Sequence, residues 1–161
     1  MNFRSLSLVI FLACLALLGF GLYLEHVMGL EPCPLCILQR YAFITAGLIA
    51  LVGALHGPKR AGRVAYGVLI ALAAVAGLGI ALRQSWIQHH PAVAECGPGL
   101  DYMLSKFPLT RALPMIFEGH GECAEVGWRF LGLSIAEWAA IWFALLLAAG
   151  LYAALALRRR E

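Results

Sequence analysis

The sequence EPCPLCILQR at residues 31–40 places a Cys-x-x-Cys pair directly before a long apolar segment. Two intervening residues allow the sulfurs of Cys33 and Cys36 to meet within one turn, as a disulfide or as ligands of one metal ion. Pro34 suits the first position of a helix, where its missing N–H is not needed. Cys33 then stands at the helix N-terminus, where the helix dipole and the free N–H groups favour a thiolate. Arg40 follows Cys36 by one turn on the same face, and its charge adds to this preference.

Four long segments with few charges predict a membrane protein. Hydrophobic residues make up 62% of the 161 residues, and the mean hydropathy is +0.83, whereas soluble domains are roughly 45–50% apolar. A membrane-spanning helix needs about 20 apolar residues, and an ionised side chain at the bilayer centre costs roughly 3 kcal/mol. We therefore expect an all-α bundle of four transmembrane helices that forms a single integral membrane domain over residues 1–161. The expected helices cover about residues 5–24, 34–55, 64–82 and 135–157, and a long loop covers about residues 83–134.

The basic residues indicate how the chain sits in the membrane. Seven of the 12 Lys and Arg residues lie at the N-terminus, between the second and third expected helices, and at the C-terminus, together with one acidic residue. The other five share the opposite side with eight acidic residues. Because cytoplasmic segments carry an excess of Lys and Arg, we expect both termini in the cytoplasm and both cysteine-bearing loops outside. The opposite orientation is the alternative that these counts disfavour.

The first apolar segment is expected to stay in the protein as a helix. It follows Arg4 as the core of a signal peptide would, but it runs into Tyr23–His26 without a small-x-small cleavage site. Cys14, in its middle, suits a small packing residue better than a redox thiol. His26 suits a polar residue at the membrane interface, with a proton carrier as the alternative.

Four cysteines lie on the expected outer side: Cys33, Cys36, Cys96 and Cys123. Four cysteines allow three pairings, of which Cys33–Cys36 with Cys96–Cys123 is the natural choice. A Cys96–Cys123 bridge suits a structural staple, worth about 3 kcal/mol. A bridge across two residues constrains little chain and is typical of redox-active pairs. A zinc site of four thiolates is disfavoured, because Cys96 and Cys123 lack close ligand spacing and an oxidising compartment disfavours free thiols.

The expected loop of about fifty residues is longer than a turn requires, and loops of that length usually carry function. Within it, Cys96 is followed by Gly97–Gly99, a Gly-Pro-Gly stretch that predicts an exposed turn. Trp86, Trp128 and Trp138 fall near the expected membrane interfaces, where an aromatic belt accounts for them.

Taken in order, these features resemble the disulfide bond formation protein B (DsbB) family, the inner-membrane oxidoreductases of Gram-negative bacteria. The resemblance covers nearly the whole chain. It includes four helices, the Cys33–Cys36 motif with Arg40 one turn later, and a cysteine pair in the second outer loop. It also includes His26–Met28 upstream of the motif. The most specific stretch is Gly121–Glu125 through Trp128, followed by Phe130–Leu133 and Trp138.

The resemblance implies a relay of disulfides. The expected partner is a periplasmic thioredoxin-like thiol oxidase of the DsbA type, whose thiolate attacks the Cys96–Cys123 disulfide at Cys96. Cys123 then attacks Cys33 and releases Cys36 as a thiolate beside a bound quinone. Two electrons pass to the quinone, and the Cys33–Cys36 disulfide forms again. A DsbA-type partner is itself a strong oxidant, with a reduction potential of about −120 mV. A quinone therefore has to drive the series of disulfide exchanges.

The resemblance also implies the residues of the site. The four outer cysteines are the expected catalytic residues, and Arg40 is the cation expected to stabilise the thiolate beside the quinone. Relatives carry a His near the outer end of the third helix that is held to approach the quinone. Arg83, thirteen residues before Cys96, stands at comparable spacing and is the second expected quinone-binding residue. For Trp128, a place at the interface is favoured over contact with the quinone. Ubiquinone is the expected acceptor, menaquinone is the alternative, and no metal is expected.

Three other interpretations remain. A paralogue would use the same chemistry to load a different dithiol partner. A vitamin K epoxide reductase-like enzyme also has four helices and a quinone, but its Cys-x-x-Cys follows its loop pair, the opposite order to this chain. A scaffold stapled by two disulfides predicts that Cys33→Ser lowers stability and leaves partner oxidation unaffected. A transporter lacks support, since no helix centre carries an ionisable residue.

Overall fold

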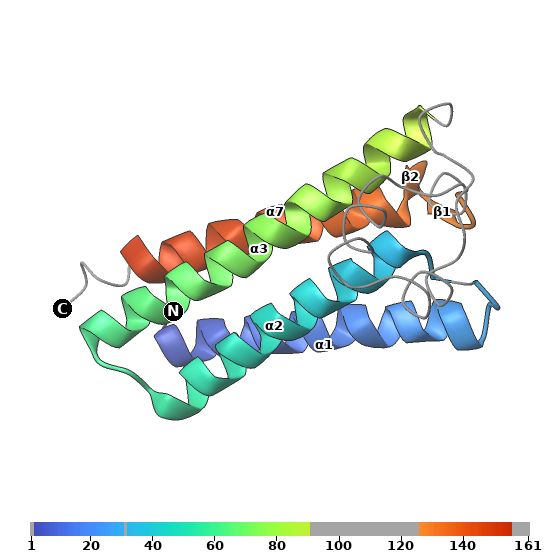
Figure 1. Ribbon diagram of the computed structural model, residues 1–161. Coiled ribbons are helices and arrows are strands. Elements are labelled where there is room, and N and C mark those ends of the chain that lie inside the picture. Colours follow the sequence, from blue (N-terminus) through green and yellow to red (C-terminus); the bar gives the residue numbers. More distant parts are fainter. Residues whose placement is uncertain (1, 31, 91–125, 156–161) are drawn as a thin grey trace, which may run out of the picture.

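The computed structural model describes residues 2–30, 32–90 and 126–155, and it forms an all-α membrane bundle (Figure 1). Each of the four helices in this part of the chain is long and apolar enough to cross a membrane, which confirms the predicted fold class. A short antiparallel hairpin precedes the last helix. The helices are α1 (Phe3–His26), α2 (Pro34–His56), α3 (Arg60–His89) and α7 (Ile135–Leu155), and the strands are β1 (Arg129–Phe130) and β2 (Leu133–Ser134).

The two ends of the bundle carry different parts of the chain. The start of α1, the connection from α2 to α3 and the end of α7 lie together at one end (Figure 1). The start of α2, the end of α3 and the hairpin lie together at the other end, which we call the hairpin end (Figure 1). The Cys33–Cys36 pair is therefore at the opposite end of the bundle from the basic Lys59–Arg63 connection.

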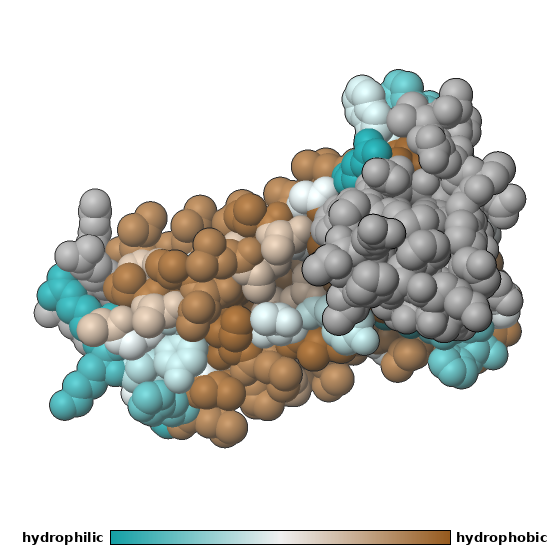
Figure 2. Space-filling model, in the orientation of Figure 1, coloured by the Kyte–Doolittle hydropathy of each residue, from teal (hydrophilic) through white to brown (hydrophobic). Residues whose placement is uncertain are grey.

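The outer surface of the helices is apolar over most of its length. Figure 2 shows a continuous hydrophobic surface along the middle of the bundle and hydrophilic residues at its ends. Large apolar side chains from every helix are exposed there, among them Leu12, Leu48, Leu72 and Leu145. Such side chains are stable in contact with lipid. The chain is therefore a multi-pass membrane protein.

Helix α3 is longer than the sequence predicted. It starts at Arg60 rather than at residue 64 and continues to His89 rather than ending at residue 82. The prediction stopped at the first charge on each side, but long cationic side chains at helix ends extend toward the polar interface and do not end a helix. The next helix-breaking residue in the sequence is Pro91. The predicted start of the long loop at residue 83 was thus wrong, since the helix continues past it.

Small residues allow α3 and α7 to approach closely. A Cβ atom added to Gly67 of α3 would lie 2.7 Å from the backbone nitrogen of Ala154 and 2.8 Å from the carbonyl oxygen of Gly150, both on α7. Further along α3, a Cβ atom on Gly77 would overlap the ring of Phe143. Membrane helices associate through such close contacts, because lipid offers no hydrophobic driving force between them.

Cys14 lies where α1 meets α2. Its side chain is buried, and a Cβ atom added to Gly47 of α2 would lie 3.1 Å from the Cβ of Cys14. A larger residue at either position would separate the two helices. The surroundings of Cys14 are those of a packing residue.

Two glycine substitutions on α3 test this packing. Gly67→Ala should lower the free energy of unfolding by about 1–3 kcal/mol, because the new methyl group overlaps the backbone of α7. Gly79→Ala is the matched control, because a Cβ atom there meets no atom within 4 Å. It should leave stability unchanged or slightly higher, since Ala is the better helix former. Thermal unfolding in detergent, followed by circular dichroism, measures both, and an equal loss in the two variants would contradict the packing described here.

Candidate functional site

The first turn of α2 holds the two sulfurs of the Cys-x-x-Cys pair in contact. The Sγ atoms of Cys33 and Cys36 lie 2.9 Å apart. Pro34 occupies the first turn of the helix and Cys33 is its N-cap, as predicted. The backbone N–H of Cys36 donates to Cys33 Sγ at 3.4 Å. The sulfurs are close enough to exchange between two thiols and a disulfide with a small movement of the side chains.

A buried pair of amides holds the same two sulfurs from the side. Nε2 of Gln84, on α3, lies 3.1 Å from Cys36 Sγ and 3.4 Å from Cys33 Sγ. The Gln84 carbonyl oxygen accepts a hydrogen bond of 2.7 Å from Nε2 of Gln39, on α2. Gln39 is 4% exposed and Gln84 is 3% exposed. Buried amides are costly unless bonded, so this pair couples α2 and α3 to the thiols.

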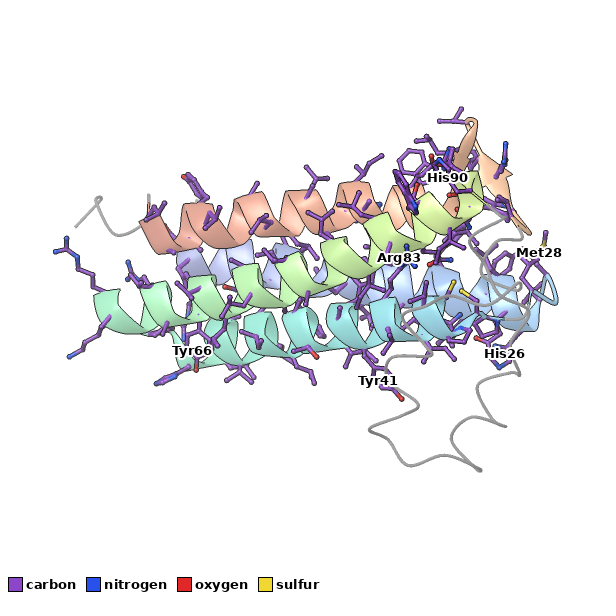
Figure 3. The ribbon with its side chains drawn as sticks, turned by 45° about the horizontal axis from the view of Figure 1, so that its top comes forward. His26, Met28, Tyr41, Tyr66, Arg83 and His90 are labelled. Atoms are coloured by element: carbon purple, nitrogen blue, oxygen red, sulfur yellow. The ribbon has the colours of Figure 1, made fainter. Side chains whose placement is uncertain are left out.

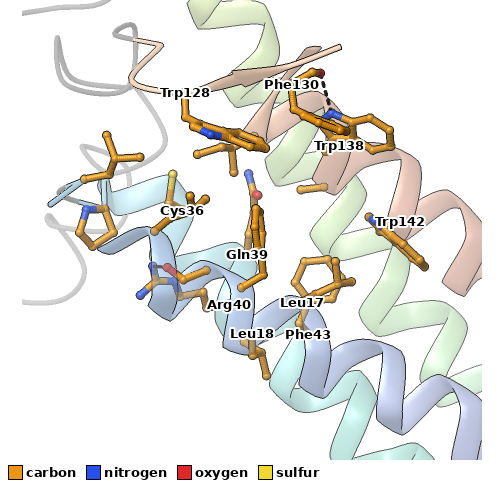
Figure 4. A pocket seen from close by; sticks show the side chains of 17 residues that line it. Leu17, Leu18, Cys36, Gln39, Arg40, Phe43, Trp128, Phe130, Trp138 and Trp142 are labelled. Carbon is orange, nitrogen blue, oxygen red and sulfur yellow. Dashed lines mark hydrogen bonds between the residues drawn. The ribbon is translucent and has the colours of Figure 1, made fainter. Parts of the chain in front are cut away.

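A cavity of about 470 Å³ opens beside Cys36, between α1, α2, α7 and the hairpin. Its wall is mostly apolar and aromatic. Cys36, Gln39 and Arg40 supply its polar edge from α2 (Figure 4). The remaining lining residues are Leu17, Leu18, Phe20, Gly21, Leu24, Leu30, Pro32, Phe43, Trp128, Phe130, Ile135, Trp138, Ala139 and Trp142.

Arg40 lines the cavity and joins α2 to α1. Its guanidinium pairs with the carboxylate of Glu25 and donates to the carbonyl oxygen of Gly21 at 3.2 Å. Arg40 is one turn from Cys36 on the same face, as predicted, and both line the cavity. The sequence did not reveal Glu25 as its partner. Because the pair is half-buried, the anion offsets the cost of holding a cation at the cavity.

The hairpin forms an aromatic wall of the cavity. Leu131 and Gly132 both have positive φ, 52° and 83°, as a type I′ turn between antiparallel strands requires. The carbonyl oxygen of Phe130 accepts a hydrogen bond of 3.1 Å from Trp138 Nε1, which ties the hairpin to α7. The ring of Trp128 stacks on Phe130 with centroids 5.8 Å apart. From the sequence, an aromatic belt at the membrane interface accounted for Trp128 and Trp138. In the structure both side chains line the cavity.

Of the other predicted site residues, Arg83 lies away from the cavity and the outer cysteine pair lies outside the described residues, while His26, for which the sequence favoured an interface position, is also away from the cavity. Arg83 is on α3 beside Gln84, and it is not among the residues that line the cavity (Figure 3). Neighbouring residues on a helix point about 100° apart, so Gln84 rather than Arg83 faces the sulfurs. His26 is exposed at the end of α1, with Nδ1 3.1 Å from the Leu22 carbonyl oxygen, and it also does not line the cavity (Figure 3). Cys96 and Cys123 lie outside the described residues.

Sequence reasoning missed Gln39 and Gln84. A signal was available for Gln39, because it lies three residues after Cys36 and therefore shares its helix face. For Gln84 the only signal in the sequence was its position next to Arg83. The spacing to Cys96 selected Arg83, and a shift of one residue in that spacing would have selected Gln84 instead. The contact between residues 84 and 36 joins two helices, and the spacing of residues along one chain does not reveal it.

Comparison with known proteins gives a consistent family. The family model described as "Disulfide bond formation protein DsbB" matches residues 3–153. The chain is 57% identical over 143 residues to disulfide bond formation protein B of Azoarcus sp. (strain BH72), covering 88% of this chain and 86% of that protein. It is 59% identical over 139 residues to the protein of the same name from Aromatoleum aromaticum, covering 86% and 84%. For the one from Marinobacter nauticus, the identity is 51% over 154 residues, covering 94% and 92%.

The match extends through all four helices and the hairpin, so it includes both the sulfur pair and the cavity described above. The chain belongs to the DsbB family of disulfide bond formation proteins, as a multi-pass membrane protein with an oxidoreductase role in disulfide formation.

Proposed function

We propose that this protein reoxidises a periplasmic thiol oxidase of the DsbA type and passes two electrons to a quinone of the bacterial inner membrane. The observation that carries this proposal is the position of Cys36, whose side chain lines a largely apolar cavity next to its partner sulfur. A cavity of about 470 Å³ falls within the usual size of small-molecule sites, about 300–1,000 Å³. The excess of basic residues at the other end of the bundle supports an outward position for the sulfurs.

The cavity residues fit a quinone ring. Aromatic side chains such as Trp128 and Trp138 offer flat apolar surfaces to a ring, and apolar residues on α1 suit its lipid tail. Arg40 and Gln39 place N–H donors on the same wall of the cavity as Cys36. These donors suit hydrogen bonds to the carbonyl oxygens of a quinone. A bound quinone supplies an acceptor for two electrons and two protons. Ubiquinone is the expected acceptor, with menaquinone as the alternative.

The cysteines carry the electrons from the partner to the cavity. In the proposed relay, a partner thiolate breaks the Cys96–Cys123 disulfide at Cys96 and leaves Cys123 as a thiolate. Cys123 then attacks Cys33, which forms a new disulfide and releases Cys36 as a thiolate at the cavity. The second partner thiol then frees Cys96 from the mixed disulfide, and Cys96 attacks Cys123 and releases Cys33. Cys33 and Cys36 re-form their disulfide and give up two electrons, for which a bound quinone would be the acceptor. Over one cycle, the partner dithiol becomes a disulfide, its two electrons and two protons go to the acceptor, and both cysteine pairs return to their starting state.

The first turn of α2 suits a sulfur that becomes a thiolate. Cys33 is the N-cap, so the free N–H groups and the dipole of α2 stabilise negative charge that develops on the first turn. Cys36 lines the cavity and Cys33 does not. Cys36 is thus the sulfur suited to face the acceptor, and the proposed relay has the other thiol attack its partner, Cys33.

Quinone reduction by the purified protein in detergent tests the proposal, with a reduced DsbA-type protein as electron donor. Wild type should turn over, and Cys33→Ser and Cys96→Ser should each lose at least about 10³-fold, because each breaks the chain of thiol exchange. Cys14→Ser is the matched control and should keep near wild-type turnover, since Cys14 is buried between α1 and α2 away from the cavity. Running the assay with ubiquinone and menaquinone analogues decides between the two acceptors.

Turnover that survives Cys33→Ser would contradict the relay and favour a stapled scaffold or a different electron path. Reduction of the quinone by Cys96→Ser with the natural partner at the wild-type rate would remove the outer pair from the relay. Loss of turnover in Cys14→Ser, with normal thermal unfolding, would show that the cysteine roles are assigned wrongly.

Substitutions of the Arg40–Glu25 pair separate charge from packing. Arg40→Met should lower kcat/KM for the quinone at least about tenfold, or about 1.4 kcal/mol, because the cavity loses its cation beside Cys36. Glu25→Gln keeps that cation and should lower kcat/KM for the quinone much less. The double variant should resemble Arg40→Met alone. If Glu25→Gln and Arg40→Met lose activity equally, the pair acts only by joining α1 to α2, and the proposed role of the cation is wrong.

A further inference from the structure

The NH2 nitrogen of Gln84 lies within hydrogen-bonding distance of both sulfurs of the Cys33–Cys36 pair. Its Nε2 is 3.1 Å from Cys36 Sγ and 3.4 Å from Cys33 Sγ, within the usual range for hydrogen bonds to sulfur. The Cys33 thiol donates to Cys36 Sγ, so Cys36 accepts from two directions. These contacts lie in a small buried cluster that also contains Leu35 and Ile87.

The bond to Gln39 determines which end of the Gln84 amide faces the sulfurs. Nε2 of Gln39 donates to the Gln84 carbonyl oxygen at 2.7 Å, so the Gln84 NH2 group is directed to the other side, at the two cysteines. Both side chains are more than nine-tenths buried, and their backbones belong to different helices. The orientation of the amide is therefore held by α2, on the face that also carries Cys36 and Arg40.

A hydrogen-bond donor beside a sulfur pair stabilises the reduced form of the pair more than the disulfide form. Reduction adds two electrons and one proton to the disulfide, breaks the S–S bond and leaves one thiol and one thiolate. A thiolate is a charged acceptor, and hydrogen bonds to charged groups are roughly twice as strong as those between neutral groups. Disulfide sulfurs are neutral, so the same hydrogen bond stabilises them less. A fixed N–H donor thus stabilises the reduced pair, and stabilising the reduced form makes a disulfide a stronger oxidant.

We propose that Gln84, oriented by Gln39, is a positioning residue that raises the reduction potential of the Cys33–Cys36 pair by donating to the sulfurs in their reduced state. The inference rests on the proposed function only in taking Cys33 and Cys36 as a redox pair. A neutral amide suits this position because it adds no net charge to a buried cluster. Arg40 does not take this position, because its hydrogen bonds within the described residues go to Glu25 and the Gly21 carbonyl and not to either sulfur.

The test measures the potential of the pair without partner or quinone. The full chain, with Cys96→Ser and Cys123→Ser so that only one pair titrates, is equilibrated with glutathione or dithiothreitol redox buffers. Two thiols of the buffer supply the two electrons and become its disulfide. Alkylation of free thiols and mass measurement then give the fraction of the Cys33–Cys36 pair that is reduced.

Three variants distinguish donation from packing. Gln84→Met keeps the length of the side chain and removes the donor, and it should shift the equilibrium about tenfold toward the disulfide, a potential lower by about 30 mV. Gln84→Glu keeps the shape but replaces the NH2 group with oxygen, and it should shift further in the same direction. Gln39→Met leaves the donor in place but unanchored, and it should give a smaller shift of the same sign.

Gln88→Met is the matched control, one turn further along α3. Its carbonyl oxygen has no hydrogen-bond partner among the described residues, and neither sulfur is bonded to it there. It should leave the potential unchanged. Thermal unfolding of each variant shows whether the bundle is intact, and Gln39→Met provides a second test if Gln84 variants do not fold.

A wild-type potential in Gln84→Met, or a potential in Gln84→Glu no lower than in Gln84→Met, would overturn the inference. The second result would mean that the carbonyl end of the amide faces the thiols. Either result leaves the proposed function intact as long as the pair still titrates. A pair that forms no disulfide in any buffer would instead refute the proposed function itself.

Discussion

The contact between two sulfurs at the first turn of α2 is the constraint around which this half of the bundle is arranged. Polar groups at membrane depth are costly unless they are paired, and the two polar side chains that follow Cys36 on α2 have partners on other helices. Gln39 is bonded to Gln84 across α2 and α3, and Arg40 is paired with Glu25 across α2 and α1. The same bonds that compensate these groups also fix α2 between its neighbours, so the sulfurs are held by the packing of the bundle.

The arrangement separates two tasks along one helix. The N-cap position of Cys33 provides a sulfur stabilised by the helix end, while Cys36 faces an apolar cavity closed by the hairpin and α7. In the proposed relay, thiol exchange with protein cysteines would occur at Cys33 and electron transfer to a small apolar acceptor at Cys36. The two sulfurs share one hydrogen-bond donor, the Nε2 of Gln84.

The sequence predicted the elements of this site better than their contacts. Charge-free segments identified the four helices, because charge in the bilayer is costly, and Pro34 correctly placed Cys33 at a helix start. The same rule ended α3 too early, since Arg83 is tolerated near a helix end. Contacts between helices depend on the rotation of each helix, which one sequence does not specify. Gln84 was therefore missed, and the tryptophans were assigned to an interface although two of them line the cavity with the hairpin.

The most direct measurement of the central claim is photoaffinity labelling of the intact protein in membranes with a photoreactive ubiquinone analogue, followed by identification of the labelled residues. Labelling should fall on cavity residues such as Trp128, Trp138 and Phe43, and excess unlabelled quinone should remove it. Labelling that excess quinone removes, but that falls on lipid-facing residues such as Leu12 and Leu72 and not on the cavity, would show that the acceptor binds elsewhere. The cavity beside Cys36 would then not be the site where electrons leave the protein.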